Sequence, residues 1–148
     1  MSDSHINVGP ITCQLSELIS FIPGTKPAFA ETILQADHPF SLQVNVNFAG
    51  PGAIALMPLL PAIQVEFYAK PLGPELGQTL GRVEVVAEPH RFIYQPTLHL
   101  GPPATVGLLP GNIYLIGAVL RVGALNWPSL INGFTEDLTI EICDSSLH

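Results

Sequence analysis

The sequence predicts an all-β fold, a two-sheet antiparallel sandwich of about seven or eight strands. Two observations carry this prediction. Fifteen prolines and thirteen glycines are spread along the 148 residues, so they divide the chain into short segments. Several of these segments alternate apolar and polar residues, which is the pattern of a half-buried strand. The architecture resembles that of immunoglobulin-like domains. The length suits a single β-sandwich domain over residues 1–148.

The N-terminal segment allows two interpretations. Apolar residues recur at helical spacing between Ile11 and Ile22, but Pro10 and Pro23 bracket a segment that suits only a short helix. We therefore expect extended structure with at most one short N-terminal helix. Residues 28–36 follow as a candidate strand.

Residues 40–48 are the clearest predicted strand. Apolar and polar residues alternate here without exception, and the polar face is rich in amides and carries no charge. The residues predicted to point inward are Phe40, Leu42, Val44, Val46 and Phe48.

The remaining segments are weaker but follow the same logic. Residues 53–60 are apolar, yet Pro58 cannot donate to a strand ladder, so we expect an edge piece or a packed loop. Residues 62–70, 82–88, 91–100 and 137–143 are predicted strands, with a break or bulge at Pro96. Residues 71–81 and 101–111 are predicted connections, and residues 126–128 a turn.

Residues 112–125 give the strongest functional hint. The segment is rich in strand-forming residues, yet both of its alternating faces are apolar, which is unusual for a strand with one face in water. Gly117 and Gly123 are candidate bulge positions. The second apolar face requires a cover. That cover is either residues 53–60 of the same chain or another molecule.

Composition excludes several functions. The net charge is −7, and the five lysines and arginines are scattered, so no basic stripe exists for nucleic-acid binding. No uninterrupted apolar run reaches membrane-spanning length. The N-terminus lacks the pattern of a secretory signal, so we expect a cytoplasmic protein. Cys13 and Cys143 are expected to be reduced, with a disulfide between them as the alternative.

No catalytic, cofactor-binding or metal-ligating constellation is recognisable. His90 and His99 are a weak metal candidate, since strict alternation places them on opposite faces unless Pro96 marks a bulge. Asp37 and His38 precede a proline, which is typical of a turn. We therefore expect no cofactor. An enzyme with an unrecognised site is kept as a third hypothesis.

The distribution of charge indicates an interface. No formally charged residue lies between Asp37 and Glu66, and Arg121 is the only one between Arg91 and Glu136. Apolar surfaces with few charges are typical of interface centres. We predict a non-enzymatic structural or protein–protein interaction module that forms a homo-oligomer or binds a protein partner. The candidate interface residues are Tyr114, Ile116, Leu120, Trp127, Leu56 and Leu59.

The alternative function is a small-ligand-binding sandwich. An apolar ligand would occupy a void beside residues 112–125. A carbohydrate would bind the outer face of residues 40–48 if aromatic side chains lined it.

Overall fold

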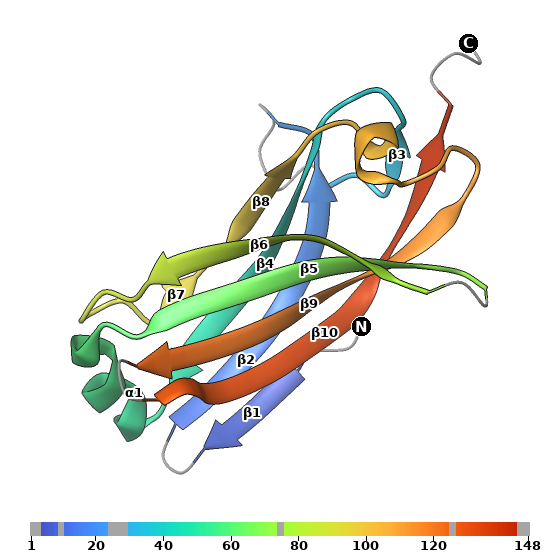
Figure 1. Cartoon of the computed structure of the whole chain (residues 1–148). Coiled ribbons are helices and arrows are strands. Elements are labelled where there is room, and N and C mark those ends of the chain that lie inside the picture. Colours follow the sequence, from blue (N-terminus) through green and yellow to red (C-terminus); the bar gives the residue numbers. More distant parts are fainter. Residues whose placement is uncertain (1–3, 9–10, 24–29, 74–75, 125–126, 145–148) are drawn as a thin grey trace.

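Two five-stranded sheets pack face to face and confirm the predicted β-sandwich (Figure 1). The computed structural model describes residues 4–8, 11–23, 30–73, 76–124 and 127–144. Within these ranges there are ten strands, more than expected, because residues 4–8 form an additional strand and the predicted strand at residues 91–100 is divided in two at Pro96. The immunoglobulin-like strand arrangement stays a prediction.

Sheet A contains β1 (Ser4–Val8), β2 (Ile11–Phe21), β4 (Phe40–Ala49), β7 (Ile93–Tyr94) and β8 (Thr97–Leu100). Strand β4 pairs with β2 on one edge and with β7 and β8 on the other. The predicted inward side chains of β4 are all buried, which confirms the alternation seen in the sequence.

Residues 11–21 form β2, which confirms the expected extended structure, and the alternative of a short N-terminal helix is wrong. A bulge between Ser16 and Ile19 explains the error. Glu17 adopts a left-handed backbone conformation with φ 53°, and both Leu15 and Leu18 are buried as a result. A bulge therefore produces the three-residue spacing that resembles a helical stripe.

Sheet B has the order β3 (Ile33–Gln35), β10 (Trp127–Cys143), β9 (Ile113–Ala124), β5 (Ala62–Pro71) and β6 (Gln78–Val86). Strand β3 runs parallel to β10, so the sandwich is not entirely antiparallel. The turn expected at residues 126–128 is wrong at Trp127 and Pro128, which open β10, while Asn126 lies outside the described residues. Strand β6 begins within the expected connection at residues 71–81.

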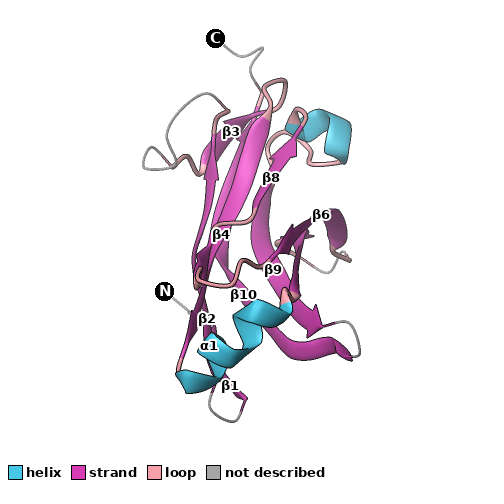
Figure 2. Cartoon of the chain, turned by 90° about the vertical axis from the view of Figure 1, so that its left-hand side faces the viewer, coloured by secondary structure: helices cyan, strands magenta, loops and turns pink. Residues whose placement is uncertain are grey.

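Residues 53–59 are helical, contrary to the edge piece or packed loop expected for residues 53–60. They form the end of α1 (Pro51–Leu56) and η1 (Met57–Leu59), and each helix has a proline in its first turn, where the missing N–H costs nothing. Helix α1 contacts β2 and β4 and lies across one end of the sandwich (Figure 2). Ala53, Leu56 and Met57 close the core there. A further short helix, η2 (Pro103–Val106), lies in the connection before β9.

Of the two predicted covers for the second apolar face of β9, residues 53–60 lie instead across one end of the sandwich, and cover by another molecule stays a prediction. Part of this face is covered within sheet B, while Ile113 is 40% exposed. Tyr68 of β5 lies opposite Gly117 and its ring covers the glycine. The Tyr68 hydroxyl donates to the Glu136 carboxylate, which Lys70 also approaches at 3.4 Å. Strand β9 pairs with β5 without a bulge. The register shift beside Gly117 arises from the extra residue in β10.

Replacing Gly117 with alanine is expected to lower the free energy of unfolding by about 1–3 kcal/mol. The new Cβ would lie 2.3 Å from a carbon of the Tyr68 ring, so the ring must move and lose its bond to Glu136. Urea denaturation measures the cost. In a Tyr68→Ala background the same substitution should cost little, and an equal cost in both backgrounds would show that the ring is not responsible.

The two cysteines are free, so the alternative disulfide is not formed. Cys13 is fully buried in the core, and burial raises the pKa of its thiol from 9.0 to about 12. Cys143 is partly exposed. A thiol reagent should therefore modify Cys143 in the native protein and Cys13 only after unfolding.

Alkaline pH is expected to destabilise the fold through Cys13. Because its native pKa is raised, the stabilisation is fully present below about pH 9 and is lost as the pH rises toward 12. Between these two pKa values the free energy of unfolding should fall by at most about 1.4 kcal/mol per pH unit. Urea denaturation at about pH 8 and about pH 10 tests this, and Cys13→Ala should flatten the dependence. An unchanged slope in Cys13→Ala would assign the effect to other groups.

Candidate functional site

Most of the predicted interface residues belong to the core. Tyr114, Ile116 and Leu120 are on the inner face of β9 and are at most 4% exposed, because sheet A packs against them. Leu56, the last residue of α1, is 5% exposed on the buried side of that helix. These four side chains therefore cannot contact a partner in the folded chain. Trp127 is in β10, but its side chain lies outside the described part, and Leu59 is exposed.

Five of the eleven exposed large apolar side chains in the described part of the chain lie at the end of the sandwich that carries α1. We call this surface the helical end. Its members come from α1, η1 and the adjoining ends of β6 and β7, and all are more than half exposed. They are Ile54, Leu59, Leu60, Val86 and Ile93.

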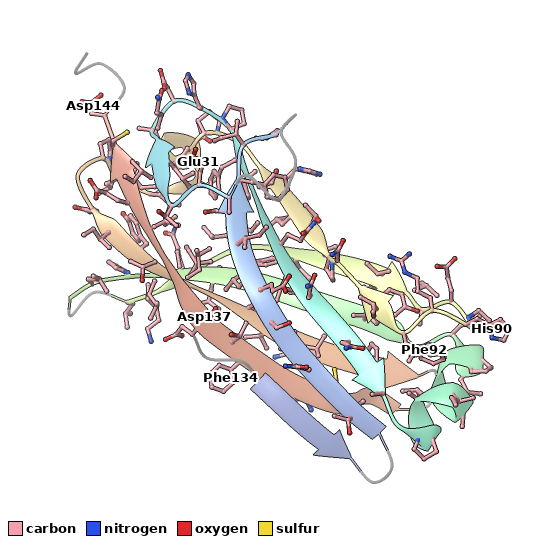
Figure 3. All side chains as sticks on the ribbon, turned by 180° about the vertical axis from the view of Figure 1, so that it is seen from behind. Glu31, His90, Phe92, Phe134, Asp137 and Asp144 are labelled. Carbon is pink, nitrogen blue, oxygen red and sulfur yellow. The ribbon has the colours of Figure 1, made fainter. Side chains whose placement is uncertain are left out.

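A shallow apolar groove lies within the helical end. Its volume is about 310 Å³, and it is lined by Phe48, Ala49, Gly50, Ala53, Ile54 and Phe92. Phe92 lies beside α1 and close to His90 (Figure 3). Its carbonyl accepts the Phe48 amide at 2.8 Å, which holds this wall of the groove against β4.

Tyr94 fixes the turn that precedes Phe92. Its hydroxyl accepts the Glu88 amide at 2.9 Å and donates to the Arg91 carbonyl at 2.8 Å. The Tyr94 ring is buried edge-on against Phe48, with centroids 6.1 Å apart. Tyr94 therefore supports two residues that line the groove, Phe48 through ring packing and Phe92 through the turn before it.

Leu60 is held in an unfavourable backbone conformation at this end. Its φ and ψ are 53° and 55°, in the left-handed region, where a side chain costs roughly 1–2 kcal/mol relative to ordinary helical angles. The side chain is 52% exposed, so the core does not require leucine here. Neither backbone geometry nor core packing explains this choice of residue.

The helical end is almost free of charge. The nearest charged groups, Glu88 and Arg91, form an ion pair at 3.3 Å, and the Arg91 guanidinium lies 4.9 Å from the Tyr94 ring centroid. The missing charges between Asp37 and Glu66 were the one signal in the sequence for this surface. Ile54 and Leu60 lie in the apolar segment 53–60 that the sequence indicated, whereas Val86, Ile93 and Phe92 were not singled out, because they belong to other segments of the chain.

The outer face of sheet A is polar, but its groups bind one another. Gln43 donates to Thr97 at 2.8 Å, and Asn45 donates to Glu17 at 2.7 Å. Among the described residues, every buried side-chain nitrogen and oxygen has a partner. Amides that are already paired are poorly placed to bind a carbohydrate.

The histidine candidates are not brought together. His99 of β8 lies opposite Ser41, whereas Ile93, three residues after His90, lies opposite Asn47. Six residues of β4 separate these partners, about 20 Å at the usual rise. In the described part no group of three His, Cys, Asp or Glu side chains lies close enough to hold a metal.

Two polar pairs resemble catalytic pairs only superficially. Ser41 Oγ lies 2.7 Å from His99 Nδ1, but Ser41 is fully buried and inaccessible to a substrate. His38 and Asp37 are 3.7 Å apart and exposed in the turn before β4, as expected for a turn.

No helix in the described ranges is long and apolar enough to cross a membrane. No protein-family model matches the chain, and no curated protein matches its sequence.

Three solved structures show distant likeness to the chain. β-Glucosidase from Listeria innocua in complex with glucose is 10% identical with a TM-score of 0.44, and the match covers 90% of this chain and 16% of that chain. The sporulation control protein Spo0M from Bacillus subtilis is 9% identical with a TM-score of 0.44, and the match covers 92% of this chain and 50% of that chain. AggA, the major subunit of aggregative adherence fimbriae type I from Escherichia coli, is 9% identical with a TM-score of 0.40, and the match covers 90% of this chain and 95% of that chain. The chain therefore spans 16% of the first and half of the second. At these identities and TM-scores the likenesses carry no argument about function.

Proposed function

We propose that the protein is a non-enzymatic β-sandwich interaction module that self-associates or forms part of a larger assembly. The carrying observation is the helical end, where five apolar side chains are exposed and one of them, Ile54, lines an apolar groove. Apolar surfaces of this kind are unusual on monomers and typical of interface centres. Of the residues expected from the sequence, Leu59 belongs to this surface.

The proposal also rests on the paired state of the polar groups elsewhere. The amides of sheet A bind neighbouring side chains, and the Ser41–His99 pair is shielded by burial of the serine. The compartment that we propose is the cytoplasm, because two unpaired cysteines are typical of a reducing environment.

Light scattering of the purified protein at micromolar concentrations tests self-association. We expect a concentration-dependent species larger than the monomer. Leu59→Ser should shift this species toward monomer while leaving the circular dichroism spectrum unchanged. Phe134→Ser is the matched control, because Phe134 is 62% exposed on β10, away from the helical end, while Leu59 is 65% exposed (Figure 3). A monomer at every concentration would contradict self-association.

A further inference from the structure

We propose that β6 pairs edge to edge with β6 of a second copy of this chain about a twofold axis, so that two copies of sheet B form one continuous sheet. In this arrangement Arg82 of each copy lies opposite Glu84 of the other. The inference goes beyond the proposed function, because it concerns a strand edge and does not depend on the groove of the helical end.

Strand β6 is the longest strand at an edge of either sheet. It has nine residues, lies last in sheet B and pairs with β5 alone (Figure 1). The other edge strands are shorter, since β1 has five residues, β3 has three, and Pro96 divides β7 from β8. The unpaired N–H and C=O groups along an edge strand are a template for pairing with another strand.

The hydrogen bonds to β5 show which backbone groups face the free edge. The Ala87 amide, directly after β6, donates to the Pro61 carbonyl at 2.9 Å, so Ala87 bonds toward β5. Backbone groups alternate in direction along an antiparallel strand, so Val85 and Val83 also bond toward β5. The residues between them direct their N–H and C=O groups to the free edge. These residues are Arg82, Glu84 and Val86.

The outer face of β6 makes this edge complementary to itself. Arg82 and Glu84 are exposed and stand two residues apart, so a twofold axis beside Val83 places each arginine opposite the glutamate of the other copy. No described side chain forms an ion pair with Arg82, and Gln64 donates to the Glu84 carboxylate at 2.9 Å. Opposite charges that face each other across two strands stabilise the pairing.

The neighbouring registers are disfavoured. An axis beside Arg82 would place the two arginines opposite each other, and an axis beside Glu84 would do the same to the two glutamates. A slip of one residue would turn the paired side chains to opposite faces of the sheet. In the proposed register the two copies of Val83, which is only partly buried against the core, meet as a close pair without hydrogen bonds.

Charge reversals test the register. Arg82→Glu and Glu84→Arg should each weaken homodimerisation by about tenfold or more in sedimentation velocity, because both opposite-charge pairs become like-charge pairs. Glu84→Arg should do so even though it lowers the net negative charge. Arg121→Glu is the matched control, because Arg121 is exposed on the inner strand β9 of the same sheet, and it should leave dimerisation unchanged. Unchanged circular dichroism would show that the variants fold.

Mixing the two variants tests the twofold pairing. The Arg82→Glu copy is acidic at both positions and the Glu84→Arg copy is basic at both, so a mixed pair has opposite charges at both contacts. We expect a heterodimer in native mass spectrometry that is tighter than either variant homodimer. The double variant Arg82→Glu/Glu84→Arg should recover the wild-type homodimer.

Hydrogen exchange locates the contact on the backbone. The amides of Arg82, Glu84 and Val86 should exchange more slowly as the protein concentration rises, because they become bonded to the second copy. The amides of Val83 and Val85 already bond to β5, so their exchange should be slow at every concentration.

The outcomes separate this inference from the proposed function. A wild-type oligomer that both charge reversals leave intact overturns the β6 contact but leaves association through the helical end standing. Edge amides that exchange equally fast at all concentrations, or a variant mixture without heterodimer, overturn it in the same way. A dimer that is lost with the charge reversals but kept in Leu59→Ser supports the β6 contact and contradicts the role of the helical end. A wild-type monomer at every concentration overturns both contacts.

Discussion

Replacing Leu120 with alanine is expected to lower the free energy of unfolding by about 3 kcal/mol, within the range of about 2–5 kcal/mol for buried leucines. Leu120 is fully buried on the inner face of β9. It lies opposite Val65 of β5 and Gly133 of β10, in the centre of sheet B. The two flanking strands limit collapse around the lost methyl groups, so most of the cavity cost remains.

The same substitution at Leu59 should affect stability much less, because Leu59 is exposed whereas Leu120 is in the core. Leu59→Ala should change the unfolding free energy of the monomer by less than about 0.5 kcal/mol, as is usual for surface substitutions. Both variants should be unfolded in urea at a concentration where wild type is monomeric, because association stabilises the native state by mass action. If Leu120→Ala instead left stability unchanged and dissociated an oligomer, β9 would face a partner rather than sheet A.

The main strands could be predicted because their burial repeats every second residue. Residues 40–48 and 62–70 alternate strictly, and both lie within strands, β4 and β5. The apolar inner face of β9 was visible in the same way. The cover over Gly117 on its outer face could not be predicted, because it comes from Tyr68, a residue of the neighbouring strand. A cross-strand aromatic leaves no mark in the local sequence of the strand that it covers.

The helical end could not be predicted for a different reason. Pro58 was interpreted as unable to donate to a strand ladder, although proline also suits the first turn of a helix. The groove is assembled from β4, α1 and the segment before β7, which are separated in the chain. Local periodicity indicates which residues are buried within one element, but it does not indicate which exposed residues of different elements become neighbours.

Removal of the Tyr94 side chain by Tyr94→Ala is expected to lower the free energy of unfolding by about 3–5 kcal/mol, as for other large core truncations. The ring is 1% exposed and packs edge-on against Phe48. Tyr94→Phe keeps the ring and removes only the hydroxyl. Its cost should be about 1–3 kcal/mol, because the hydroxyl makes two hydrogen bonds, each with a net value of about 0.5–1.5 kcal/mol.

Tyr94→Phe is expected to weaken self-association as well, because the hydroxyl holds the turn that positions Phe92 at the groove. Tyr114→Phe is the matched control. The Tyr114 hydroxyl accepts the Leu109 amide at 2.8 Å, but it does so in the connection that leads into β9 and makes no contribution to the groove. Both variants should show a similar loss of stability in urea, whereas only Tyr94→Phe should raise the dissociation constant in light scattering. Equal effects of the two variants on association would mean that general destabilisation, and not the geometry of the groove, governs the contact between copies.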